Sequence, residues 1–147
     1  MRITVPGDKS LTQRALILAS IASGTSSLRG LLFGGDAEST ANALRAMGAN
    51  IPPIPQDGGA IEVEGVGLDG LATPDAPLDL GNSGTGTRLL LGLLAGAGVG
   101  ATLTGDTSLQ SRPMKRVTAP LCAMGASFEF LEEQDRLPLT ITNAAGL

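Results

Sequence analysis

Apolar residues in the first half of the chain recur with helical spacing in two segments and with strand-like spacing in four. A helix is predicted over residues 10–22. A second helix is predicted over residues 36–47, with Asp36 as its N-cap and Gly48 as its C-terminal stop. Short apolar or alternating runs predict strands at residues 3–5, 26–31, 49–54 and 60–64. The last two strands should pair with each other around the Pro- and Gly-rich turn between them.

The second half of the chain shows the same order of apolar segments. Strands are predicted at residues 78–80, 101–104, 128–131 and 139–142. One helix is predicted over residues 84–97 and another over residues 112–124. Pro113 would stand at the first position of the second helix, where no backbone N–H is needed. Pro120 lies inside the same helix and should kink it.

A short string of residues occurs twice. The pattern Leu-x-Ala-Met-Gly-Ala is found at residues 44–49 and again at residues 121–126, and two further matches occur in the same order at an offset of about 75 residues. This repetition predicts two copies of one βαβαββ unit, at residues 1–75 and 76–147. Because the helices are apolar nearly all round, we expect an α/β (α+β) fold with helices inside and sheets outside.

Composition narrows the possible functions. The chain has 147 residues, 42% of them hydrophobic, which is enough for one domain with a real core. It has no histidine, so a Ser-His-Asp triad or a His-ligated metal site within this chain is excluded. The net charge of −4 argues against a nucleic-acid surface. Six of the ten basic residues nevertheless cluster at three turns, as in a binder of small anions.

Cellular location is inferred from what the sequence lacks. The single cysteine, Cys122, cannot form an intrachain disulfide and suggests a reducing compartment. No signal-peptide pattern is present, and the longest apolar run, residues 89–97, is too short to span a bilayer. We therefore expect a cytoplasmic protein with no membrane partner.

The first candidate anion site lies at the start of the first predicted helix. Lys9, Ser10 and Arg14 follow a Pro-Gly turn, and Arg14 falls one helical turn after Ser10 on the same face. Unpaired backbone N–H groups and the helix dipole favour negative charge at this point. Together these groups suit a carboxylate or a phosphate. The alternative is an ordinary capped helix start with solvated charges.

Two further segments could contribute to an anion site. Residues 81–88 open the helix of the second unit with small residues, and their glycines allow the backbone to approach a ligand. Arg112 sits just before a later helix and could hold a carboxylate in a bidentate fork. The alternatives are a flexible turn and a solvated basic turn, respectively.

Three motifs in order resemble one enzyme family. The chain resembles the enolpyruvylshikimate phosphate synthase family over its whole length. The resemblance rests on three motifs in this order: Pro-Gly-Asp-Lys-Ser-x-x-x-Arg, then Gly-Asn-Ser-Gly-Thr-x-x-Arg, then Thr-Gly-Asp followed by Ser-Arg-Pro. The resemblance implies a transferase that moves the enolpyruvyl group of phosphoenolpyruvate to the 5-hydroxyl of shikimate 3-phosphate and releases phosphate, on the shikimate pathway to chorismate and the aromatic amino acids. It implies no metal and no organic cofactor. It also implies an inside-out α/β lobe built from βαβαββ units.

The resemblance also assigns roles to single residues. Lys9 would be the catalytic residue and would contact phosphoenolpyruvate, close to both substrates. Ser10 and Arg14 would bind shikimate 3-phosphate. The phosphoenolpyruvate pocket would be formed, besides Lys9, by Asn82, Gly84 and Arg112. Arg88 would support the loop.

Length is the main departure from the family. Its members are roughly three times longer, so the resemblance implies a fragment that lacks the third unit and the other lobe, including the proton-transfer carboxylates. Residues 1–8 could cross to that other lobe in a longer protein. We expect the lone chain to be inactive, and to self-associate or to bind a complementing fragment. The alternatives are the sister UDP-N-acetylglucosamine enolpyruvyl transferase, or a non-catalytic anion-binding repeat domain.

Overall fold

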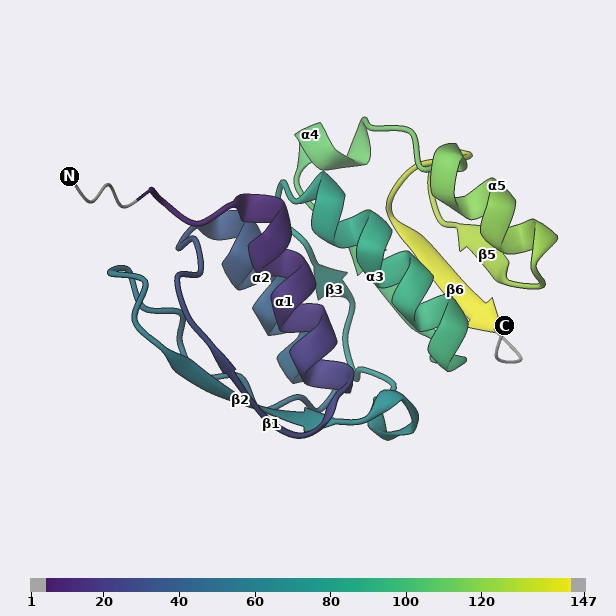
Figure 1. Cartoon of the computed structure of the whole chain (residues 1–147). Coiled ribbons are helices and arrows are strands. Elements are labelled where there is room, and N and C mark those ends of the chain that lie inside the picture. The colour runs from purple at the N-terminus through teal and green to yellow at the C-terminus, as the bar shows by residue number, and fades with distance from the viewer. Residues whose placement is uncertain (1–4, 144–147) are drawn as a thin grey trace.

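Three helices of twelve to fourteen residues pack side by side and contribute buried apolar residues to the core. The structure is a computed structural model and describes residues 5–143. The three helices are α1 (Lys9–Ile21), α2 (Gly35–Ala46) and α3 (Gly84–Ala97). Figure 1 shows them running in the same general direction, with one small sheet beside α1 and a larger one beside α3. The fold is thus a mixed α/β arrangement, as the apolar pattern predicts.

The remaining elements form two sheets and their connections. Their bounds are β1 (Ser23–Leu28), β2 (Ile61–Val66), η1 (Leu68–Gly70), β3 (Leu78–Asp79), β4 (Ala101–Thr104), α4 (Thr107–Gln110), α5 (Lys115–Ala123), β5 (Ser127–Phe130) and β6 (Leu139–Asn143). Strands β1 and β2 form an antiparallel pair, and the larger sheet has the order β3-β4-β6-β5. In that sheet β3 and β4 are parallel and the other neighbours are antiparallel.

Aliphatic side chains fill the core. Its largest fully buried side chains are Leu16, Leu44, Met47, Leu80, Leu90, Leu91, Leu94, Leu103, Leu109, Met114, Leu139 and Ile141. None of the three phenylalanines is buried to this degree, and Phe33 is 44% exposed. Leucine and alanine allow the helices to lie close together, which brings their N-terminal ends near one another at the upper edge of Figure 1.

Most elements fall close to their predicted bounds, and α3 and β4 match them at both ends. The Gly48 stop is confirmed, since this residue has φ +100° just after α2. The strand predicted at residues 3–5 falls mainly outside the described residues. The kink at Pro120, which lies inside α5, stays a prediction, as do the division into units 1–75 and 76–147 and the crossing of residues 1–8.

The hairpin predicted from residues 49–54 and 60–64 is wrong. The first of these segments forms no strand and makes only one isolated bridge, from Asn50 to Glu64. Its prolines have no N–H to donate to a strand ladder. The Arg45 guanidinium donates hydrogen bonds to the carbonyl oxygens of Ile51 and Pro52 at 2.7 and 2.8 Å. Strand β2 pairs with β1 instead, from Ser23 opposite Val66 to Leu28 opposite Ile61, so β1 begins earlier than the apolar signal suggests.

Two helix starts also differ from their predictions. Asp36 is not the N-cap of α2; the cap is Gly34, which makes no side-chain hydrogen bond, and Asp36 lies in the first turn. The helix predicted over residues 112–124 is present but starts three residues later than predicted. A short helix, α4, precedes it with Asp106 as its N-cap, and α5 begins only at Lys115. Pro113 therefore lies before the helix rather than at its first position.

Candidate anion-binding site

Close backbone packing defines the start of α1. The Asp8 side chain caps the helix by accepting the Leu11 N–H at 2.7 Å. A Cβ on Gly7 would lie 2.3 Å from the carbonyl oxygen of Gly30, so only glycine fits there. This turn presents Lys9 and Ser10 on the exposed first turn of the helix, as expected for a ligand-binding helix start.

The predicted residues on α1 form two pairs. The ammonium of Lys9 lies 2.8 Å from the Asp36 carboxylate at the start of α2, and the Lys9 side chain is 55% exposed. Both residues line a small hollow of about 310 Å³ between the two helix starts. The Arg14 guanidinium donates to the Ser10 hydroxyl at 2.7 Å, one helical turn away. All three predicted groups thus stand along one helix within two turns of its start.

The start of α3 brings together Gly84 and two guanidinium groups. Ser83 caps this helix by accepting the Gly86 N–H at 3.1 Å. A Cβ on Gly84 would lie 2.9 Å from Nη1 of both Arg112 and Arg88. Arg88 also donates to the carbonyl oxygens of Gly84 and Pro113, at 2.9 and 3.1 Å. It thereby ties α3 to the turn before α5.

Arg112 is held over this turn by a chain of side chains. It donates through Nη2 to the amide oxygen of Asn82. The Asn82 amide nitrogen in turn donates to both carboxylate oxygens of Asp106, at 3.0 and 2.8 Å. The hydrogen bond from Asn82 lowers the pKa of the Asp106 carboxyl, helped by the Leu109 N–H and the Arg112 charge, while desolvation opposes them. The carboxylate therefore stays ionised and fixes which way the Asn82 amide points.

A buried glutamine connects the two halves of the candidate site. Gln13 lies on α1, four residues after Lys9, and is fully buried. Its amide nitrogen donates to the Ser83 hydroxyl at 2.5 Å, and it lies 3.1 Å from both the Asp36 carbonyl oxygen and the Thr40 hydroxyl. Between residues 5 and 143, no hydrogen bond or ion pair joins Lys9, Ser10 or Arg14 to the group of Asn82, Gly84 and Arg112. The link between the halves is this amide.

Three of these residues were missed by the sequence reasoning as members of the site. Asp106 carries a usable signal, because Asp in Thr-Gly-Asp ahead of a helix is a typical N-cap. Asp36 was assigned to a cap rather than to an ion pair. Gln13 carries no signal, since one polar residue on a helix face predicts exposure and not burial.

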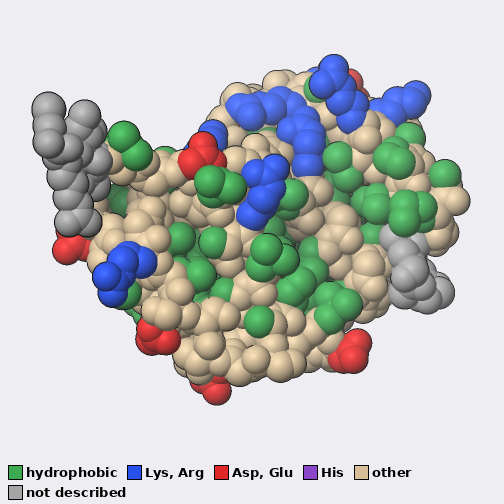
Figure 2. Space-filling model, viewed as in Figure 1, with side chains coloured by type: hydrophobic (Ala, Val, Ile, Leu, Met, Phe, Trp, Pro, Cys, Tyr) green, Lys and Arg blue, Asp and Glu red, His purple; other side chains and the backbone are tan. Residues whose placement is uncertain are grey.

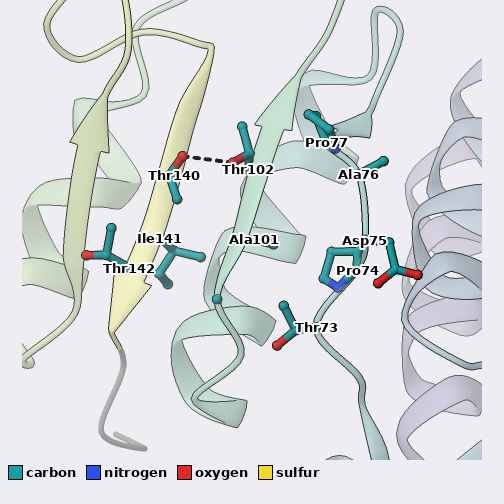
Figure 3. A pocket seen from close by; sticks show the side chains of 11 residues that line it. Thr73, Pro74, Asp75, Ala76, Pro77, Ala101, Thr102, Thr140, Ile141 and Thr142 are labelled. Atoms are coloured by element: carbon teal, nitrogen blue, oxygen red, sulfur yellow. Dashed lines mark hydrogen bonds between the residues drawn. The ribbon is translucent and has the colours of Figure 1, made fainter.

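Charge and shape place the candidate site at one edge of the molecule. Figure 2 shows Lys and Arg side chains gathered mainly along the upper part of this face, above the starts of the helices in Figure 1. A larger hollow of about 440 Å³ lies elsewhere, on the sheet beside β4 and β6 (Figure 3). Its lining includes Thr102, whose hydroxyl lies 2.8 Å from that of Thr140. None of the predicted site residues lines this hollow.

Two observations concern the described residues as a whole. None of the helices between residues 5 and 143 combines the length and the apolar character needed to traverse a bilayer. Within the same part of the chain, no group of three or more Cys, Asp or Glu side chains is arranged to hold a metal ion.

Cations and backbone amides gathered at helix starts are the arrangement expected of an α/β protein that binds anions. A model of the EPSP synthase (3-phosphoshikimate 1-carboxyvinyltransferase) family matches residues 1–147, and the chain belongs to this family. It is 55% identical over 146 residues to a 3-phosphoshikimate 1-carboxyvinyltransferase of Alkalilimnicola ehrlichii, covering 99% of this chain and 32% of that protein. It is also 50% identical over 145 residues to the protein of the same name from Nitrobacter winogradskyi, and this match covers 97% of this chain and 32% of that protein.

A solved structure agrees with these sequence matches. An EPSP synthase from Acinetobacter baumannii superimposes with a TM-score of 0.88 and 42% identity, covering 95% of this chain and 31% of that one. The expected fold and family are confirmed. The chain spans about a third of the length of the relatives that it matches.

Proposed function

We propose that this chain supplies part of the substrate site of a 3-phosphoshikimate 1-carboxyvinyltransferase. Arg112 carries the proposal, because it is held over the Gly84 backbone by Asn82 and is aimed at the start of α3. A guanidinium beside a helix start is a strong site for a carboxylate or phosphate. Arg112, Asn82, Gly84 and Lys9 would bind phosphoenolpyruvate.

Shikimate 3-phosphate would bind along α1. Ser10 and Arg14 already share a hydrogen bond on the exposed face of that helix, so an anion can take the place of their mutual contact with little rearrangement. Lys9 lies between this pair and the start of α2. It would contact phosphoenolpyruvate and lie close to both substrates.

The proposed reaction joins the two substrates and releases phosphate. The 5-hydroxyl oxygen of shikimate 3-phosphate forms a bond to the enol carbon of phosphoenolpyruvate, and the bond from that carbon to the phosphate oxygen breaks. In the overall balance the hydroxyl proton leaves with the released phosphate. Lys9 is the proposed catalytic residue, because a preorganised ammonium stabilises negative charge that develops during such a transfer. The reaction needs no metal and no organic cofactor in this proposal.

The isolated chain is proposed to be inactive. It matches about a third of each relative, and the resemblance places the proton-transfer carboxylates in the remaining part. Family membership favours this activity over that of the UDP-N-acetylglucosamine enolpyruvyl transferase. A non-catalytic anion-binding domain stays the alternative for the chain by itself. We further propose a cytoplasmic location, in keeping with a single cysteine, and association with a second copy or a complementing fragment.

The proposal is tested by titrating the ¹⁵N-labelled chain with phosphoenolpyruvate and with shikimate 3-phosphate. Chemical-shift changes should cluster at residues 8–14, 82–88 and 111–116. Arg112→Ala should weaken phosphoenolpyruvate binding about ten- to a hundredfold, because a charge-assisted hydrogen bond is lost. Arg29→Ala, which removes an exposed guanidinium elsewhere, is the matched control. Equal losses from the two variants, or shifts scattered over the surface, would favour solvated turns without a site.

A further inference from the structure

We propose that Gln13 is a positioning residue that holds the starts of α1, α2 and α3 in one fixed relation. Its side chain comes from α1, and its amide nitrogen contacts the Asp36 carbonyl and the Thr40 hydroxyl on α2 and the Ser83 cap of α3. No other polar side chain in the described part of the chain joins all three helices through hydrogen bonds.

The direction of the Gln13 amide is determined by its surroundings. The Asp36 carbonyl oxygen can only accept a hydrogen bond, so the nitrogen end of the amide must face it. The oxygen end is then left without a hydrogen-bond partner in the described residues, although Gln13 is fully buried. A buried acceptor without a partner destabilises a fold, and natural proteins keep such groups mainly where they serve function.

Two of the three contacts of Gln13, those with Asp36 and Ser83, lie next to proposed substrate-binding groups. Asp36 is held to α1 twice, by its carbonyl through Gln13 and by its carboxylate through Lys9. Ser83 lies between Asn82 and Gly84 in the chain, so its position determines where both of them stand. Gln13 therefore controls the spacing between Lys9 on one helix and the Gly84 turn on another.

Packing around Gly86 provides a second observation. A Cβ at this position would lie 2.6 Å from the Thr40 hydroxyl, 2.7 Å from the Ser83 hydroxyl and 3.1 Å from the Gln13 amide nitrogen. Glycine is thus required by the polar network itself and not by the backbone conformation, because Gly86 lies within a regular helix. The network leaves no room for a side chain from α3.

The first test removes the amide and keeps the volume. In Gln13→Met, amide exchange at Gly86 and in the first turn of α2 should accelerate about tenfold beyond any change in global stability. Ser20→Ala is the matched control, because Ser20 is also fully buried on α1 but bonds only to Leu16 of its own helix. Exchange that rises uniformly in both variants would overturn the positioning role.

The second test concerns the ligand, and it rests on the proposed function. Under conditions in which both variants are folded, Gln13→Met should weaken phosphoenolpyruvate binding at least about fivefold, and Ser20→Ala should leave it unchanged. Local exchange that accelerates without any loss of affinity would overturn the link between the network and the site. A wild-type chain that binds no phosphoenolpyruvate would contradict the proposed function, while the exchange measurement would still decide whether Gln13 positions the helices.

A third variant avoids dependence on Gln13→Met being folded. Gly86→Ala keeps Gln13 but pushes a methyl group into the network, and it should reproduce both effects in weaker form. Gly92→Ala is its control on the same helix, since a Cβ there meets nothing within 4 Å. Alanine is the better helix former at both positions, so a difference between the two variants reports on the network. Identical behaviour of the two variants would overturn the proposal.

Discussion

The Asn82 amide nitrogen donates to both carboxylate oxygens of Asp106, while its amide oxygen accepts from Arg112. The Asn82 side chain is thus held between an anion 24 residues further along the chain and a cation 30 residues further along. Because the carboxylate can only accept and the guanidinium can only donate, neither allows the amide to flip. Asp106 therefore orients Arg112 through the Asn82 side chain.

Acid should weaken this arrangement. The pKa of Asp106 is lowered in the folded chain, so its contribution to stability is present above the unfolded carboxyl pKa of about 4 and is lost as the pH falls through the lower folded value. Urea denaturation from pH 3 to pH 7 should show a smaller loss of stability towards acid for Asp106→Asn than for wild type. Parallel pH profiles would contradict the role of the ionised carboxylate.

A methyl group at Gly84 should impair phosphoenolpyruvate binding. In Gly84→Ala the Cβ would lie 2.9 Å from two guanidinium groups, so Arg112 must move. We expect a loss of about tenfold in phosphoenolpyruvate affinity and a smaller loss for shikimate 3-phosphate, measured by calorimetry. Gly96→Ala on the same helix, where a Cβ meets nothing within 4 Å, should bind as wild type does.

The purified 147-residue chain should not turn over its proposed substrates. Each positioned acid or base contributes about 10²- to 10⁴-fold to a rate, and the groups assigned to this task by the resemblance are outside the chain. Phosphate release from phosphoenolpyruvate and shikimate 3-phosphate is the measurement, with Lys9→Ala as control. Release above that of the control would contradict the prediction.

An apolar face on α1 and α3 should drive self-association. Leu18 is 63% exposed, and together with Arg14, Ile17, Leu89 and Leu93 it lines an open hollow of about 290 Å³. Figure 2 shows apolar side chains spread over the middle of this face. Leu18→Glu should reduce association in sedimentation velocity, because exposed apolar patches favour association.

Leu68→Glu is the control for this change, since Leu68 is 43% exposed on η1, apart from α1 and α3. A wild-type chain that stays monomeric over a wide concentration range would contradict the prediction. Equal effects of the two substitutions would show that the apolar face of α1 and α3 is not the contact surface.

Loss of Arg45 should destabilise the fold itself. Its guanidinium donates to the carbonyl oxygens of Ile51 and Pro52 and to the Asn42 side chain at 2.6 Å. Hydrogen bonds from a charged group contribute about 1.5–3 kcal/mol, so Arg45→Met should lower the free energy of unfolding by about 2 kcal/mol. Chemical denaturation measures this loss. The control is Arg136→Met, which breaks a surface ion pair with Glu133 and should lower the free energy of unfolding by well under about 1 kcal/mol.

Periodicity predicts the long helices well because their apolar faces determine their burial. It places α3 correctly at both ends, and it places the three candidate anion-binding turns at helix starts or just before one. It fails where polar groups decide the structure. The segment after Gly48 has the apolar content of a strand, but Arg45 satisfies its carbonyl groups, and its prolines cannot complete a ladder.

The same limit applies to the candidate site. Lys9, Arg14 and Arg112 can be found from the sequence because they are cations at predicted turns, and the family resemblance adds Asn82 and Gly84. The contacts that hold them in place involve residues far apart in sequence, such as Gln13 with Ser83 and Asn82 with Asp106. No local pattern encodes such pairs, because each partner alone has the spacing of an ordinary surface or cap residue.

The 70-residue separation between Gln13 and Ser83 has a consequence for how the chain acquires its structure. A hydrogen bond between such distant residues closes only after the intervening segments have been brought together, so it belongs to the late stages of folding. During synthesis, α1 and α2 leave the ribosome long before Ser83 does. Until then the Gln13 amide can reach only its partners on α2, and the helices that bear Lys9 and Asp36 have no fixed third neighbour. The proposed site, which takes residues from both halves, is therefore complete only once the second half of the chain has been made.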